Sequence, residues 1–403
     1  MKIMTFANYS ILFSLILASC LPVSNGENAP SEAVPNEATA PTETPVPSQE
    51  DSNEKPPSGF ELEFDTDFSR SLISFDEILS GGPKKDGIPA IDEPTFETIE
   101  QADGWLESNE PVIQLIIGGE VKAYSLQILM WHELVNDTLG GVPIVVSFCP
   151  LCNTAIVFGR SVDNQILDFG TTGRLRYSNL IMYDRQTESW WQQAEGRAII
   201  GELLGTQLEF FPASIISWDE FKNAHPAGLV LSRETGFSRT YGSNPYVGYD
   251  DVNNPPFLYD GPETPGQLPA VAHVLAVDIN DDPVAYPLDM LSEMHVVNDK
   301  VGDQDIVILW KSGTASALDA SSIAEGKDVG AAIAYSSLVD GKYLTFKFDG
   351  LRFLDDQTGS IWNVLGRATD GDLVGRQLEE IVSVNHLWFS WAVFKPETRV
   401  YQP

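Results

Sequence analysis

Two stretches of the chain match each other in sequence, and the match continues through further blocks in the same order. The block at residues 112–137 aligns without a gap to residues 274–299. Three later blocks pair residues 184–191 with 355–362, 205–208 with 375–378, and 218–221 with 391–394. Blocks that recur in one order predict two tandem copies of one module, the first within residues 59–250 and the second within residues 262–403.

The local pattern within a copy favours strands. Short β-branched and aromatic runs are typical of strands, and the first copy has them at residues 112–117, 121–124, 142–148, 154–158, 180–183 and 189–191. Helical spacing occurs at residues 125–133, which start at the capping residue Ser125, and at residues 217–224. We therefore predict an α+β fold that is predominantly antiparallel β, with small helices at the edges.

The N-terminus has the layout of a bacterial export signal. Lys2 gives a basic start, residues 11–17 form an apolar core too short to span a membrane, and small residues precede Cys20. Leu17-Ala18-Ser19-Cys20 resembles a lipobox, in which the cysteine is lipidated; a plain secretory signal is the alternative. Residues 1–20 are thus predicted to be a lipoprotein signal peptide. The mature protein is expected in the cell envelope, anchored to a membrane through Cys20 and facing the extracytoplasmic side, in the periplasm or at the cell surface.

Residues 21–58 are rich in Pro, Ser, Thr, Ala, Asn and Glu and contain almost no large apolar side chain. Such a segment buries too little surface to offset its ordering entropy, so we predict a disordered tether. The formal net charge of the chain is -34, and the tether contributes little of it. A field of this sign repels nucleic acid and anionic lipid head groups, so neither is expected as a partner.

Cys149 and Cys152 form a C-x-x-C pair at the end of an apolar run. Such a pair closes a disulfide, exchanges electrons as a dithiol, or binds a soft metal through two thiolates. In the second copy, Trp310-Lys311-Ser312-Gly313 occupies the corresponding region. A pair needed only for folding would be expected in both copies, so the difference favours a specialised site in the first.

The residues that follow the pair, Asn153-Thr154-Ala155-Ile156-Val157-Phe158, have the pattern of a strand. In thioredoxin-like enzymes a C-x-x-C pair instead opens a helix, whose N-terminus lowers the thiol pKa. The segment is closer to a metal-binding knuckle, a turn that presents two thiolates to zinc or iron. Asn153 stands where such a turn needs a positive φ, which asparagine tolerates.

His132 and Glu133 precede the strand that leads to the cysteines. A helix packed against that strand would bring His132 near both thiolates, giving a Cys2His site for copper or zinc with Glu133 as a possible additional ligand. The alternative is a hydrogen-bonded histidine without a metal. No motif surrounds His273, His295 or His386.

A second candidate region is the loop within residues 169–179. Arg174, Arg176, Ser178 and Asn179 belong to the first copy only, and they are candidates for binding an anionic ligand. Asp184, Thr187 and Trp191 recur in the second copy. Recurrence favours a hairpin turn and its core for these three.

Several motifs together resemble an uncharacterised bacterial family with a Cys-Pro-Leu-Cys motif, catalogued as a domain of unknown function. They are Asp86-Gly87-Ile88-Pro89-Ala90-Ile91-Asp92, Trp131-His132-Glu133-Leu134-Val135-Asn136-Asp137, Ser147-Phe148-Cys149-Pro150-Leu151-Cys152 and residues 178–187. The resemblance spans nearly all of the folded part and implies an exported or lipid-anchored protein. It implies no reaction. In that family Gly commonly follows the second cysteine, where this chain has Asn153.

Three functions remain open from the sequence. The leading hypothesis is a lipid-anchored extracytoplasmic protein whose first module binds copper or zinc through Cys149, Cys152 and His132. The second is a thiol-disulfide oxidoreductase that uses the same pair, because the expected compartment is oxidising. The third is a non-catalytic binding or scaffold protein in which a structural disulfide staples one turn.

Overall fold

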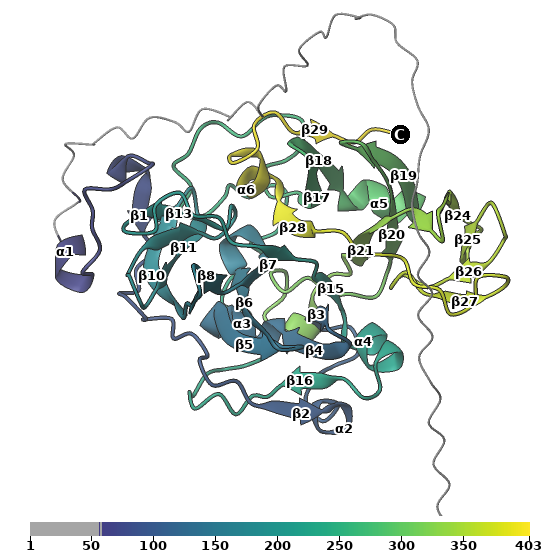
Figure 1. The fold of residues 1–403 in the computed structure, drawn as a ribbon, viewed down its shortest axis with the longest axis horizontal. Coiled ribbons are helices and arrows are strands. Elements are labelled where there is room, and N and C mark those ends of the chain that lie inside the picture. Colours follow the sequence, from purple (N-terminus) through teal and green to yellow (C-terminus); the bar gives the residue numbers. More distant parts are fainter. Residues whose placement is uncertain (1–55, 57–58) are drawn as a thin grey trace, which may run out of the picture. The chain divides into compact units, whose positions relative to one another are not determined.

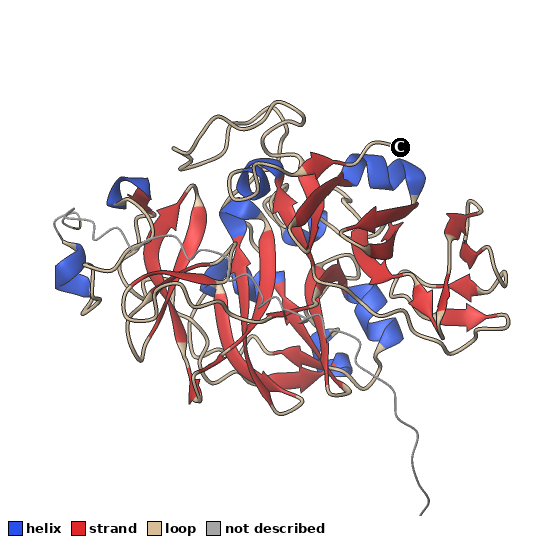
Figure 2. Ribbon diagram, turned by 45° about the horizontal axis from the view of Figure 1, so that its top comes forward, coloured by secondary structure: helices blue, strands red, loops and turns tan. Residues whose placement is uncertain are grey.

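Strands are the predominant regular structure of the described chain, which comprises residue 56 and residues 59–403 of this computed structural model and belongs to the unit Gln49–Pro403. Most neighbouring strands run antiparallel, and the helices are few and short (Figure 2). The prediction of a fold that is mostly antiparallel β is confirmed. The predicted signal peptide with Cys20 lies outside the described residues, as does the predicted tether apart from Pro56.

The described chain starts with an aromatic segment that packs on a later sheet. Phe60, Phe64, Phe68 and Phe75 form a buried cluster with Trp190. The early elements are α1 (Phe60–Glu63), a 3-10 turn (Phe75–Glu77), β1 (Ile78–Ser80), β2 (Phe96–Thr98) and α2 (Ile99–Ala102). This cluster explains why large apolar side chains, nearly absent from residues 21–58, occur again from Phe60 onward.

The first half, which we define as residues 59–243, contains three larger sheets with strand orders β15-β3-β4-β16-β2, β14-β7-β6-β5 and β1-β10-β11-β12-β13 (Figure 1). Their elements in chain order are β3 (Pro111–Ile117), β4 (Glu120–Ser125), α3 (Leu126–His132), β5 (Leu134–Leu139), β6 (Val142–Cys149), β7 (Thr154–Gly159), the small pair β8 (Ser161–Val162) and β9 (Gln165–Ile166), β10 (Phe169–Arg176), β11 (Asn179–Asp184), β12 (Trp190–Gln192), β13 (Arg197–Ile200), β14 (Phe210–Phe211), β15 (Ser214–Ser217), α4 (Trp218–Ala224) and β16 (Leu229–Leu231).

The second half, residues 262–403, has sheets of strand order β28-β17-β18-β29, β19-β20-β21 and β24-β25-β26-β27. Its elements are β17 (His273–Ile279), β18 (Asp282–Pro287), α5 (Leu288–Met294), β19 (Val296–Val301), β20 (Gln304–Lys311), a 3-10 turn (Ile323–Glu325), β21 (Ala331–Ser336), β22 (Leu338–Val339), β23 (Lys342–Tyr343), β24 (Phe346–Phe348), β25 (Phe353–Asp355), β26 (Ile361–Trp362), β27 (Ala368–Asp370), β28 (Ser383–Leu387), α6 (Trp388–Ala392) and β29 (Arg399–Val400). The three sheets of the first half have the same arrangement of their central strands: β15-β3-β4-β16, β7-β6-β5 and β10-β11-β12-β13 correspond in order to β28-β17-β18-β29, β21-β20-β19 and β24-β25-β26-β27. That the halves are copies of one module stays a prediction.

The two halves contact each other through two pairs of strands. β28 of the second half lies beside β7 of the first, and β15 of the first lies beside β21 of the second. The largest buried cluster accordingly joins Phe148 and Leu151 with Leu318 and Phe389. Because β7 follows the cysteine turn, this contact brings the second half next to Cys149 and Cys152.

Several local predictions from the sequence are confirmed. β3 and β4 form a hairpin through Gly118 and Gly119, whose φ values are 60° and 84°. Ser125 caps α3 by accepting a hydrogen bond from the Gln127 backbone N–H. The buried Asp184 carboxylate accepts hydrogen bonds from Thr187 and from the Trp191 indole N–H, as Asp355 does from Thr358 and Trp362.

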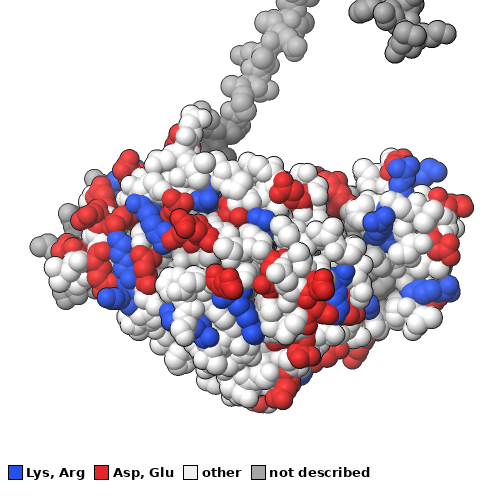
Figure 3. All heavy atoms as spheres, turned by 90° about the horizontal axis from the view of Figure 1, so that it is seen from below, with Lys and Arg blue, Asp and Glu red and all other residues white. Residues whose placement is uncertain are grey.

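Acidic side chains are spread over the face seen in Figure 3, with basic side chains between them. Among the described residues, no helix is both long and apolar enough to cross a bilayer.

The surplus of acidic residues predicts a protein that salt stabilises. The chain carries 58 acidic against 24 basic residues, so its like charges repel more strongly in the compact state than in the unfolded one. Raising NaCl from about 0.01 M to about 1 M shortens the screening length from about 30 Å to about 3 Å. The midpoint of urea unfolding is expected to rise across this range. A midpoint that falls would contradict the expectation.

Candidate functional site

Cys149 and Cys152 lie on a tight turn between two central strands. β6 ends at Cys149, Pro150–Cys152 form one 3-10 turn, and β7 begins at Thr154. Between them, Asn153 adopts a left-handed conformation with φ of 50° and ψ of 41°. The predicted turn, followed by a strand and not by a helix, is confirmed.

Both thiols are free and buried, with exposed fractions of 2% for Cys149 and 0% for Cys152. They donate to one acceptor, the carbonyl oxygen of Ser178, at 3.8 Å from the Cys149 sulfur and 3.4 Å from the Cys152 sulfur. The side-chain amide of Asn179 donates to the Cys152 sulfur at 3.3 Å. The two sulfurs are therefore held side by side against the turn between β10 and β11.

The surroundings of Cys149 favour the neutral thiol. Burial raises the pKa of Cys149 well above its ordinary value, and the neighbouring Cys152 thiol and Glu133 carboxyl raise it further. A hydrogen bond from the Leu180 backbone N–H acts in the opposite direction. Because the thiolate is the reactive form, chemistry at Cys149 requires a nearby group that accepts its proton.

The Glu133 carboxyl acts electrostatically on Cys149, and backbone hydrogen bonds fix the position of this residue. Its N–H donates to the Leu129 carbonyl at 2.8 Å, and its own carbonyl accepts the Phe148 N–H at 2.7 Å. These bonds fix the end of α3 against the end of β6, next to Cys149. Burial raises the pKa of the Glu133 carboxyl to about 8. At neutral pH the carboxyl is therefore mostly protonated.

His132 uses both of its ring nitrogens in hydrogen bonds. Its Nδ1 is 2.7 Å from the Pro89 carbonyl oxygen, and its Nε2 is 2.7 Å from the Tyr241 hydroxyl. Both ring nitrogens are thus engaged, as in the hydrogen-bonded alternative to a metal ligand. Within residues 59–403, no group of three or more His, Cys, Asp or Glu side chains is arranged to hold a metal ion. Copper or zinc binding stays a prediction.

The four candidates of the 169–179 loop separate into two pairs. Ser178 and Asn179 lie against the thiols, and the Ser178 hydroxyl donates to the Phe257 carbonyl at 2.6 Å. Arg174 forms an ion pair with Glu63 of the aromatic segment, at 3.1 Å. Arg176 forms ion pairs with Glu77 and Glu195. The arginines therefore fasten the first residues of the described chain to β10.

The second half supplies two histidines to the cysteine turn that sequence reasoning missed. His273 Nδ1 lies 3.1 Å from the side-chain nitrogen of Asn153, and His386 Nδ1 lies 2.9 Å from the Thr154 hydroxyl. Burial lowers the pKa of His386 to about 3, so its ring is neutral. No local motif marks either histidine. The contact of β28 with β7 is what brings His386 to the turn.

Residues 85–398 match the family described as Protein of unknown function (DUF3179). The chain belongs to this family. The resemblance inferred from the motifs is thus confirmed at the level of an uncharacterised family. No match was found among curated proteins or solved structures.

In this DUF3179 chain, the connection between the halves covers the cysteine turn. We call residues 244–258 the strap. The Tyr249 hydroxyl donates to the Leu151 carbonyl at 2.9 Å and accepts the Phe257 N–H at 3.2 Å. The pKa of Tyr246 is raised by burial and then by the proximity of Glu133 and Cys149. The strap also lines an open cavity of about 560 Å³. The strap is therefore hydrogen-bonded to the turn that carries the thiols.

One buried carboxylate fastens the strap to the second half. Asp250 has an exposed fraction of 0% and lies 2.9 Å from His273, 2.5 Å from Ser316 and 3.2 Å from Lys327. Burial opposes its ionisation, but the hydrogen bond and charge of His273, with Ser316 and Lys327, hold the pKa of Asp250 down at about 2. Asp250 is thus a charged anchor over the cysteine turn.

Proposed function

We propose that Cys149 and Cys152 are a redox-active pair that cycles between dithiol and disulfide by exchange with a partner disulfide. The observation that supports this best is the pair of free thiols held against one carbonyl oxygen, that of Ser178. The Cys152 thiol also lies within hydrogen-bonding range of Cys149, as a pair that closes a disulfide requires. The absence of the pair from the second half fits a dedicated site.

The exchange has two steps. Ionised Glu133 accepts the proton of Cys149, and the thiolate attacks the partner disulfide, forming a mixed disulfide and expelling one partner thiolate that takes up this proton. Cys152 then attacks the Cys149 sulfur, and its proton goes to the second partner thiolate. The protein gains one internal disulfide, and the partner gains two thiols. Asn179 donates a hydrogen bond to the Cys152 sulfur and so holds it in position for this second attack.

Exchange with glutathione disulfide tests this proposal. Reduced protein is incubated with glutathione disulfide, quenched with acid, alkylated and analysed by mass spectrometry. The wild type is expected to lose both thiols without bound glutathione, and Cys152→Ser to retain glutathione on Cys149. Cys149→Ser is the matched variant in which no internal disulfide forms. Retention of both thiols by folded wild type would rule out the redox function and leave a binding or scaffold role.

Copper(I) binding is a second candidate, and the hydrogen bonds to sulfur favour it. The Asn179 amide and the Leu180 N–H both donate to the sulfurs, which offsets the charge of a buried pair of thiolates. Two thiolates suit copper(I), whereas zinc prefers four ligands. Titration with copper(I) against a competing chelator is expected to give one site that Cys149→Ser abolishes. A His132→Gln variant tests the third ligand proposed from the sequence.

We also propose that this site belongs to a lipid-anchored envelope protein with a duplicated module. Leu17-Ala18-Ser19-Cys20 supports the anchor, and an extracytoplasmic, oxidising compartment would supply disulfide partners. The matching strand orders of the two halves support the duplication. Metabolic labelling with a fatty acid, lost in Cys20→Ala, tests the anchor.

A further inference from the structure

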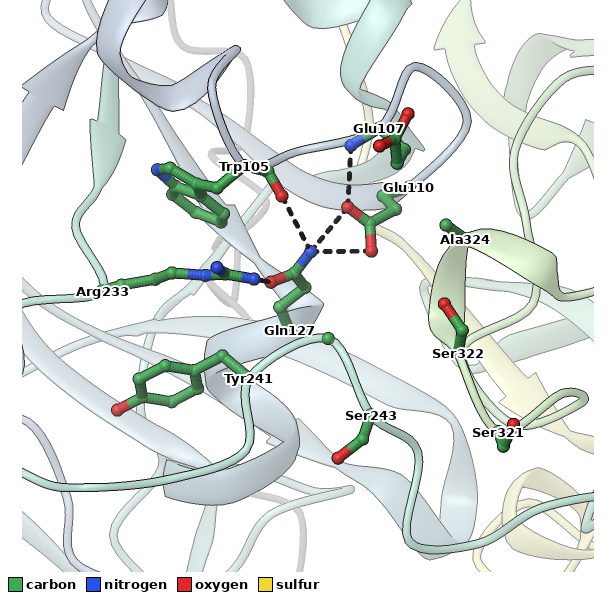
Figure 4. A pocket seen from close by; sticks show the side chains of 11 residues that line it. Trp105, Glu107, Glu110, Gln127, Arg233, Tyr241, Ser243, Ser321, Ser322 and Ala324 are labelled. Carbon is green, nitrogen blue, oxygen red and sulfur yellow. Dashed lines mark hydrogen bonds between the residues drawn. The ribbon is translucent and has the colours of Figure 1, made fainter.

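A second polar cavity lies where the halves meet, away from the thiols. Its volume is about 380 Å³, and its walls come from residues 105–127, residues 233–243 and the loop 321–324 of the second half (Figure 4). Tyr241, which hydrogen-bonds to His132, forms part of one wall. Tyr241 therefore links this cavity to His132.

A chain of three polar side chains forms one side of this cavity. The Gln127 amide nitrogen donates to both oxygens of Glu110, at 2.7 Å and 2.6 Å, and the Gln127 amide oxygen accepts a hydrogen bond from Arg233. Figure 4 shows Gln127 between the carboxylate and the guanidinium. The amide thus keeps the two opposite charges apart.

Neither charge has an ionic partner. In the part of the chain that the structure describes, no cation forms an ion pair with Glu110 and no carboxylate forms one with Arg233. Glu110 is nearly fully buried, and the Arg233 Nε–H is buried without a hydrogen-bond partner. The guanidinium packs over the Trp105 ring, 4.5 Å from its centroid. Glu110 and Glu97 act on Arg233 only at longer range, so the half-buried guanidinium forms no direct ion pair within the described residues and keeps N–H donors for a ligand.

We propose that this cavity binds a small α-amino acid zwitterion, with its carboxylate at Arg233 and its ammonium group at Glu110. A simple anion would meet Glu110 and a simple cation would meet Arg233, so a ligand with both charges fits best. Ser243, Ser321 and Ser322 lie across the cavity and offer hydroxyls to a polar side chain (Figure 4). The cavity has room for a ligand of this size.

Calorimetric titration of the full chain tests the proposal with four probes: L-alanine, propionate, ethylammonium and glucose. L-Alanine is expected to bind at least about 10-fold more tightly than either half-analogue, because each lacks one charge-assisted contact. Equal binding of propionate and L-alanine, preferential binding of glucose, or no heat with L-alanine would each overturn the proposal.

Two variants assign the binding to these residues. Arg233→Gln and Glu110→Gln are each expected to weaken L-alanine binding by about 10-fold or more. Arg239→Gln is the matched control, because it removes the same charge from an exposed arginine outside the cavity. Circular dichroism of each variant checks the fold. If Arg239→Gln weakens binding as much as a folded Arg233→Gln does, the site is not at Arg233.

Discussion

The free energy of unfolding of the wild type is expected to fall as pH rises, and Glu133→Gln is expected to abolish this fall. The pKa of Glu133 is about 8 in the folded protein, above the ordinary value of 4.5, because burial disfavours the carboxylate. Between these values the unfolded chain releases a proton that the folded protein keeps. The free energy of unfolding therefore falls with rising pH, by about 1.4 kcal/mol per pH unit from this one group. Glutamine does not ionise and contributes no such slope.

Urea unfolding of reduced protein at pH 5, 7 and 8.5 measures this effect. Between about pH 5 and about pH 8, the free energy of unfolding of the wild type is expected to fall by several kcal/mol more than that of Glu133→Gln. Glu93→Gln, at an exposed position, is the control and is expected to follow the wild type. The same pH slope in wild type and Glu133→Gln would show that the carboxyl ionises normally. Glu133→Gln is also expected to react more slowly with glutathione disulfide, because Cys149 then lacks its proton acceptor.

Asp250→Asn is expected to expose the thiols without removing any group that contacts them. Asp250 joins the strap to His273, Ser316 and Lys327, and breaking a buried charged pair costs about 3–5 kcal/mol. Part of this loss lowers the free energy of local strap opening. A decrease of about 1.4 kcal/mol in that free energy speeds thiol labelling about 10-fold.

The rate of iodoacetamide labelling of reduced protein in native buffer measures strap opening. Asp250→Asn is expected to label at least about 10-fold faster than wild type. Asp251→Asn, which makes the same change at the exposed neighbour, is expected to label at the wild-type rate. Urea unfolding of both variants separates local opening from global unfolding. An unchanged rate in a destabilised Asp250→Asn would show that the strap does not control access.

Local structure was predictable because the residues that encode it are neighbours. The glycine pair between β3 and β4, the cap at Ser125 and the left-handed Asn153 depend on backbone preferences within a few residues. The repeated Asp184 and Asp355 turns were predictable for a different reason. A motif that recurs in both halves indicates a shared structural role, and the same hydrogen bonds to tryptophan occur in both.

The partners of the cysteines were harder to predict, because they come from distant segments. His132 was expected to reach the thiols because its helix packs on the strand that carries Cys149. The structure shows that the next residue, Glu133, ends the helix with a positive φ of 58° and acts electrostatically on Cys149. His132 as a metal ligand stays a prediction. His386 and Asp250 depend on how the two halves dock. No local pattern in one sequence encodes that docking.

The equilibrium reduction potential of the Cys149–Cys152 pair tests the central claim most directly. The protein is equilibrated in glutathione buffers of defined potential, quenched with acid, and its thiols are counted by mass spectrometry. We expect a reversible two-electron transition between about -270 mV and about -120 mV, the range of proteins that exchange disulfides. A disulfide that stays intact below about -300 mV would identify a structural staple, and thiols that stay reduced throughout would exclude a redox pair.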